Sequence, residues 1–91
     1  MNENDEMEQV LETFNEWVES NCTPELLRFA QRVLPYEHWK LSYFKRRIRR
    51  CAAKGWMEGL QNAIRGYVDF ASRIKTKYET VRRVRVSTCA R

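Results

Sequence analysis

The sequence predicts a small all-α protein built from four helices. Apolar residues recur at spacings of three and four over most of the chain, which is the period of an amphipathic helix. Pro24, Pro35 and Gly55 divide this pattern into four segments, and 91 residues leave room for one domain with one modest core. Short connections favour antiparallel neighbouring helices, so we expect a four-helix domain over residues 1–81 and a basic tail over residues 82–91.

The first helix is predicted over residues 5–20. Its apolar face is formed by Met7, Val10, Leu11, Phe14, Trp17 and Val18. Asn4 or Asp5 can cap its first turn, where the helix dipole favours acidic side chains. Two heptads also fit this face, at Met7, Leu11, Phe14 and Val18, but two are too few to predict a coiled coil. The face therefore packs inside the monomer or forms a homodimer interface.

Proline and glycine signals place the second and third helices. Thr23 is the predicted N-cap of a helix over residues 24–34. The first residue of this helix is Pro24, which is favoured there because an N–H at the first helical position would have no partner within the helix. That helix ends before Pro35, because the residue preceding a proline is pushed out of the helical region. A third helix follows over residues 36–54, and Gly55 can supply the left-handed residue that ends it.

A fourth helix is predicted over residues 56–81. Its apolar stripe consists of Trp56, Leu60, Ala63, Ile64, Tyr67, Phe70, Ala71, Ile74 and Tyr78. Gly59, Ala63 and Gly66 lie along its edge, where they either let another helix cross closely or are simply weak helix positions. Residues 82–91 lose the stripe and alternate valine with arginine, which indicates a short strand or a loose basic tail.

The net charge of +5 conceals a strong asymmetry. Residues 1–27 carry eight acidic and no basic side chains, whereas residues 28–91 carry seventeen basic and four acidic ones. Such a separation suggests a polyanionic partner for the second part of the chain. The alternative is that the acidic segment lies against the basic one within the fold.

The predicted third helix combines positive charge with aromatic rings, since residues 36–55 hold seven basic and four aromatic side chains. In helical projection its core face consists of Leu41, Phe44, Ile48, Cys51 and Ala52. Tyr36, Trp39 and Tyr43 instead run down the basic flank. These rings either offer faces to bases or a partner protein, or pack on a neighbouring helix with arginines lying over them.

The basic side chains on the outer faces of the third and fourth helices and in the tail are the predicted nucleic-acid contacts. They are Lys40, Lys45, Arg46, Arg47, Arg49, Arg50, Lys54, Arg65, Arg73, Lys77, Arg82, Arg83 and Arg85. Such groups neutralise phosphates and release counterions. If the third and fourth helices are neighbours, we expect one continuous basic surface.

Several function classes are disfavoured. His38 is the single histidine, so a Ser-His-Asp or Cys-His site would have to be built around it, and a closed zinc site is improbable. The sequence contains no glycine-rich phosphate loop of a standard type. We therefore expect no enzymatic activity, no metal site and no cofactor.

The sequence also indicates a compartment. It contains no apolar run long enough to span a membrane, and its acidic N-terminus lacks the features of a secretory signal. Cys22, Cys51 and Cys89 are an odd number at wide spacing, which fits reduced thiols. We expect an intracellular protein, cytoplasmic or nuclear.

The leading hypothesis is a non-catalytic regulatory protein that binds nucleic acid with low sequence specificity. RNA, including double-stranded RNA, is favoured over DNA. The alternative is a small regulatory protein that binds another protein through exposed aromatic and arginine residues, which are frequent in interface hot spots. By analogy of type alone, compact arginine-rich chains of this kind are common among viral accessory proteins.

Overall fold

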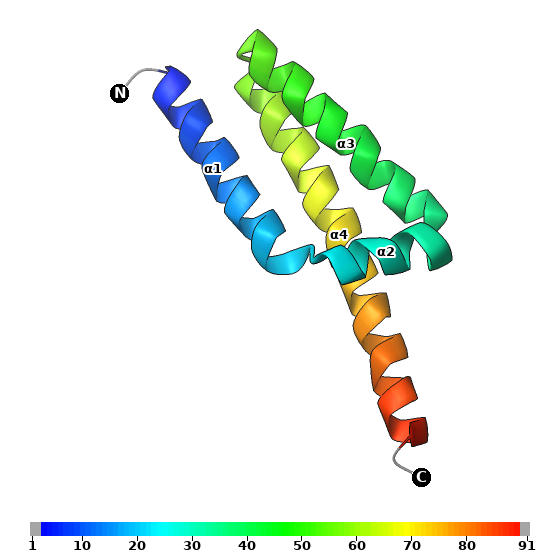
Figure 1. The fold of residues 1–91 in the computed structure, drawn as a ribbon. Helices are drawn as coiled ribbons and strands as arrows, with labels where there is room; N and C mark the ends of the chain where they lie inside the picture. The colour runs from blue at the N-terminus through cyan, green and yellow to red at the C-terminus, as the bar shows by residue number, and fades with distance from the viewer. Residues whose placement is uncertain (1–2, 90–91) are drawn as a thin grey trace.

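The computed structural model describes the backbone of residues 3–89 and the side chains of residues 5–83, and this range contains four helices and no strand. α1 spans Glu3–Asn21, α2 Pro24–Val33, α3 Pro35–Lys54 and α4 Met57–Cys89. α4 runs through the middle, with α1 on one side and α3 on the other, and α2 crosses over it (Figure 1). The prediction of a small, four-helix, all-α domain is confirmed.

The crossing of α2 decides the direction of the outer helices. α3 and α4 run antiparallel, as their short connection predicts. α1, in contrast, runs parallel to α4, because α2 carries the chain from one side of α4 to the other before α3 begins (Figure 1). The expectation that a short connection joins antiparallel neighbours therefore holds for α3 and α4, and it does not apply to α1 and α4, which no short connection joins.

The caps predicted for the second and third helices lie where the sequence places them, whereas Asn4 and Asp5 do not cap α1, because that helix already begins at Glu3. The Thr23 side chain accepts a hydrogen bond from the Leu26 amide at 3.2 Å, which satisfies a donor of the first turn of α2. Gly55 has a φ of 70° and ends α3, and the Trp56 amide donates to the Cys51 carbonyl at 2.9 Å. This is a Schellman motif, so the chain turns sharply into α4.

Two predicted boundaries in α4 differ from the structure. Trp56 was expected in the apolar stripe, but it precedes the helix and is 50% exposed, because its backbone belongs to the turn that closes α3. At the other end α4 passes Val81 and runs to Cys89. Residues 82–89 contain neither glycine nor proline, and arginine favours helix, so the helix continues without an apolar stripe. Residues 90–91 of the predicted tail lie outside the described residues.

The core lies where the four helices meet around α4. Its buried side chains are Met7, Phe14, Cys22, Leu26, Phe29, Ala30, Leu41, Ile48, Cys51, Leu60, Ala63, Tyr67, Ala71 and Ile74. The Phe14 and Tyr67 rings meet edge to face, with centroids 5.1 Å apart, and join α1 to α4. The Lys75 ammonium also donates to the Asn21 side chain at 2.8 Å, which fixes the end of α1.

The apolar face of α1 packs inside the chain. Met7 and Phe14 are 9% and 8% exposed, and Leu11 and Val18 are half-buried against the core. Of these four residues, only Leu11 and Val18 leave part of their surface free for a homodimer interface. The homodimer stays a prediction.

The molecule is elongated, at 59 × 24 × 17 Å, because α4 projects beyond the bundle after it passes α2 (Figure 1).

Candidate functional site

An aromatic seam covers one side of the contact between α3 and α4. We use this name for Tyr36, Trp39, Tyr43 and Phe44 of α3 together with Phe70 of α4. The Phe70 ring lies 6.2 Å from that of Tyr36 and 6.0 Å from that of Phe44, measured between centroids. Tyr43 links Phe44 to Trp39, at 5.1 and 5.9 Å. The rings of α3 are thus positioned by contact with each other and with a single ring of α4.

The seam is packed at its base and open at its surface. Tyr36 and Trp39 are 58% and 54% exposed, whereas Tyr43 and Phe44 are half-buried. Both interpretations of the aromatic flank are therefore partly right: the rings pack on one another and on α4, yet two of them keep a large face in solvent. A ligand with a flat apolar group has a surface to contact here.

Two cations lie over the seam, and neither is one of the arginines of α3. The Lys40 ammonium is between 5.2 and 5.9 Å from the centroids of all five rings. The Arg73 guanidinium lies 5.1 Å from the Phe70 centroid and also pairs with Asp69 at 3.0 Å. Both positions are within the range of a cation–π interaction. Lys40 and Arg73 are thus held at the seam and place positive charge beside its exposed rings.

The remaining cations of α3 form a separate basic arc, defined by Lys45, Arg46, Arg47, Arg49, Arg50 and Lys54. All six side chains are exposed. Within the described part of the chain, none of them forms an ion pair with an acidic group. The basic arc is therefore a solvated surface whose charge is available to an anionic partner.

The acidic residues do not cover this arc. They are concentrated on α1, which lies on the opposite side of α4 from α3 (Figure 1). Among the residues whose side chains are described, Glu6, Glu8, Glu12, Glu16 and Glu19 make no ion pair with a basic group. The alternative in which the acidic segment lies against the basic one holds for the packing of α1 on α4, but not for charge pairing by these glutamates. One edge of the molecule is negative and the other positive.

The candidate residues beyond α3 do not all join the arc. Arg65, Arg73 and Lys77 are exposed on the bundle part of α4. Arg82 and Arg83 are exposed on the projecting part of α4. The basic arc occupies the later turns of α3, and because α3 runs antiparallel to α4, these turns lie toward the opposite end of the molecule (Figure 1). The side chain of Arg85 lies outside the described residues. The positive charge is thus spread over α3 and along α4, and Arg82 and Arg83 lie away from the basic arc.

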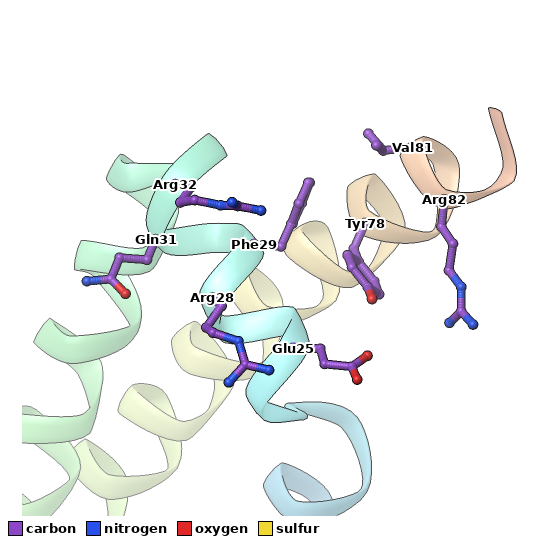
Figure 2. Close-up of a pocket in the computed structure, with 8 residues that line it drawn as sticks. All are labelled: Glu25, Arg28, Phe29, Gln31, Arg32, Tyr78, Val81 and Arg82. Atoms are coloured by element: carbon purple, nitrogen blue, oxygen red, sulfur yellow. The ribbon is translucent and has the colours of Figure 1, made fainter. Parts of the chain in front are cut away.

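A pocket opens where α2 crosses the projecting part of α4. It has a volume of about 630 Å³ and is lined by Glu25, Arg28, Phe29, Gln31, Arg32, Tyr78, Val81 and Arg82. The Phe29 and Tyr78 rings meet edge to face, with centroids 5.2 Å apart. In Figure 2 these two rings lie between Arg32, which comes from α2, and Arg82, which comes from α4.

Sequence reasoning missed most of this pocket. Arg28 and Arg32 were not among the predicted contacts, although their spacing of four residues places them on one face of α2. Only the folded chain shows that this face meets Tyr78 and Arg82 of α4.

Other kinds of site are not seen in the described range. Among these residues, no three histidine, cysteine, aspartate or glutamate side chains are grouped to hold a metal ion. Nor does any described helix have the length and apolar character needed to cross a membrane. Cys22 and Cys51 are buried free thiols, and Cys89 lies outside the described side chains.

Cys22 lies between α1 and α2 and is buried. Burial raises the pKa of its thiol, although a hydrogen bond from Tyr67 and the charge of Lys75 act in the opposite direction. A buried thiol that holds its proton is a poor nucleophile.

Comparisons with protein-family models, with curated proteins and with solved structures found no match to this chain.

Proposed function

We propose that this protein binds nucleic acid without catalysis, with RNA favoured, through the basic arc of α3 and the neighbouring aromatic seam. The observation that carries the proposal is the basic arc, whose six side chains are exposed and form no ion pair within the described part of the chain, on the same helix as two half-exposed rings, Tyr36 and Trp39. Guanidinium and ammonium groups neutralise phosphates, and the counterions they release supply most of the affinity. Aromatic rings supply faces on which unstacked bases can lie.

The same chemistry sets the specificity. Contacts to phosphate position a protein but carry no direct sequence information, so low sequence specificity follows. RNA is favoured because its loops, bulges and ends leave base faces free, and duplex RNA can be gripped along its backbone. The acidic edge formed by α1 repels phosphate and so orients the protein with α3 toward the polyanion.

A titration at two salt concentrations tests the proposal. The purified protein is titrated against single-stranded RNA, double-stranded RNA and duplex DNA of equal length, and log K is compared with log salt. We expect RNA to be preferred and the slope for a duplex to be about 0.9 per phosphate contacted. Binding that does not change with ionic strength, or no binding at low salt, would contradict the proposal.

A second candidate function is binding to another protein through the aromatic seam. It is favoured by one observation: Trp39 and Tyr36 expose more than half of their surface beside Lys40. Tryptophan and tyrosine are enriched in interface hot spots, together with arginine. If the salt titration shows no nucleic-acid binding, replacement of Trp39 by alanine and loss of a co-purified protein would support this candidate.

A further inference from the structure

The pocket between α2 and α4 has a composition that the fold does not require. Three guanidinium groups, those of Arg28, Arg32 and Arg82, surround an apolar wall made by Phe29, Tyr78 and Val81. In the part of the chain whose side chains are described, none of the three arginines forms an ion pair, and Glu25 is the single acidic lining residue. The pocket therefore has a net positive charge that nothing described neutralises.

The apolar wall is also incompletely covered. Val81, which follows Tyr78 by one turn of α4, is 41% exposed and lines the same pocket as the Phe29 and Tyr78 rings (Figure 2). Phe29 is 9% exposed and packs on the Tyr78 ring, so it forms the floor of the pocket. An apolar wall flanked by free guanidinium groups is suited to a ligand that has a flat apolar part and an anionic part.

We propose that this pocket binds one unpaired nucleotide, with the base against Tyr78 and Val81 and the phosphate held by one of the two guanidinium groups that flank the rings, that of Arg32 or that of Arg82. Arginine presents paired N–H donors that match phosphate oxygens. A base stacked on an aromatic side chain is a common and sequence-tolerant contact. A volume of about 630 Å³ is in the usual range for a site that holds a small molecule.

The geometry favours an unpaired nucleotide over a base pair. The wall lies inside a concave site between two helices, and a paired base has its faces covered by its neighbours in the stack. Only a flipped, bulged or terminal base can present a face to Tyr78. The carboxylate of Glu25 in the same pocket adds a hydrogen-bond acceptor for an amino group of a base.

This proposal takes its class of ligand from the proposed function, but it concerns a different surface from the basic arc. The two can therefore fail separately. The pocket should add a preference for strands with unpaired ends, whereas the arc should supply the general affinity for RNA.

The test uses adenosine 5′-monophosphate as the probe and the full chain as the protein. Backbone amide signals of Phe29, Arg32, Tyr78 and Val81 are followed by two-dimensional NMR during titration, with adenosine and inorganic phosphate as separate controls. We expect saturable shifts centred on these four residues, with an affinity about tenfold higher for the nucleotide than for either part alone. The variant Arg32→Gln with Arg82→Gln should abolish them.

The matched control is Arg46→Gln with Arg50→Gln, which removes the same two charges from the basic arc. It should weaken RNA binding and leave the nucleotide shifts unchanged. Nucleotide shifts centred on α3, or shifts that persist in the pocket variant, would overturn the pocket proposal. So would a pocket that responds to an acidic peptide such as hexaglutamate and not to the nucleotide, which would assign it to a protein partner. Failure of the unmodified chain to bind RNA, with the nucleotide shifts intact, would contradict the proposed function alone.

Discussion

Gly66 of α4 lies directly against the ring of Phe44 of α3. A Cβ atom at Gly66 would be 2.5 Å from the Cε1 and Cζ atoms of that ring, closer than real Cβ contacts allow. Phe44 in turn contacts Tyr43 and Phe70. The missing side chain at Gly66 therefore sets how closely α3 and α4 approach, and it positions the aromatic seam.

Replacing Gly66 by alanine should destabilise the fold and disturb the seam. The Phe44 ring must move, and overpacking of this kind costs about 1 to 3 kcal/mol, offset by about 1 kcal/mol of improved helix propensity. We expect a net loss of about 1 kcal/mol in the free energy of unfolding, measured by urea denaturation, together with weaker RNA binding.

Gly59→Ala is the matched control on the same helix. A Cβ there would be 2.5 Å from the Trp56 ring, but Trp56 is 50% exposed and can turn into solvent. The propensity gain then dominates, and stability should rise by about 0.5 to 1 kcal/mol. If both alanine variants shift the denaturation midpoint equally and in the same direction, Gly66 is not a packing contact.

The buried hydroxyl of Tyr67 predicts a loss of stability at high pH. Burial, with smaller contributions from the charge and the hydrogen bond of Cys22, raises the pKa of Tyr67 from 10.0 to about 12. The unfolded chain therefore releases this proton at a lower pH than the folded chain. Tyr67 contributes its full stabilisation below pH 10 and loses it as pH rises through about 12. The raised pKa of Cys22 acts in the same direction from about pH 9.

Tyr67→Phe separates this effect from other alkaline titrations. Phenylalanine keeps the ring that packs on Phe14 but has no proton to lose. We expect the free energy of unfolding of the variant to fall less steeply between about pH 10 and pH 12, by at most about 2 to 3 kcal/mol over the window. Denaturation curves at half-unit pH intervals would measure it, and identical slopes for the two proteins would contradict the buried-hydroxyl explanation.

The comparison of sequence and structure shows which features are local. Thr23 and Gly55 were predicted correctly because a cap depends on residues within about one turn. The direction of α1 relative to α4 was not predicted, since it depends on how α2 crosses α4, and α1 then meets α4 through Phe14 and Tyr67, which are far apart in the sequence. Helix periodicity identifies an apolar face without naming the helix that it meets.

The candidate site divides in the same way. The basic arc could be predicted, because exposed arginines on one helix face follow from the projection alone. The aromatic seam was predicted in part. Tyr36, Trp39 and Tyr43 were placed together on the basic flank, but Phe70 was predicted to belong to the apolar stripe of the fourth helix. The pocket between α2 and α4 was not predicted, because Arg32 and Arg82 are brought together only by the crossing of two helices.

Trp39 should matter for binding and little for stability. Because it is 54% exposed, its replacement by alanine leaves no enclosed cavity, and we expect a loss of about 1 kcal/mol or less. Removal of its ring should weaken single-stranded RNA binding by about 1 to 3 kcal/mol, the usual range for a stacked base. Trp56→Ala is the control, since Trp56 is similarly exposed and lies outside the seam. Equal effects of the two variants on RNA affinity would argue against stacking at Trp39.

The position of the charge, and not its total, should determine affinity. Arg46→Gln with Arg50→Gln removes two positive charges from the basic arc and lowers the net charge from +5 to +3. Asn15→Asp with Ser20→Glu adds two negative charges to exposed positions of α1 and reaches the same net charge.

If the arc contacts phosphates, only the first variant should change the salt dependence. Its slope of log K against log salt for duplex RNA should fall by up to about 1.8, or roughly 0.9 for each phosphate that the variant no longer neutralises. The α1 variant should keep the wild-type slope, because its new charges lie on the opposite side of α4. Equal slopes in both variants would mean that RNA affinity depends on the overall charge of the protein. This result would contradict the assignment of the basic arc as the binding surface.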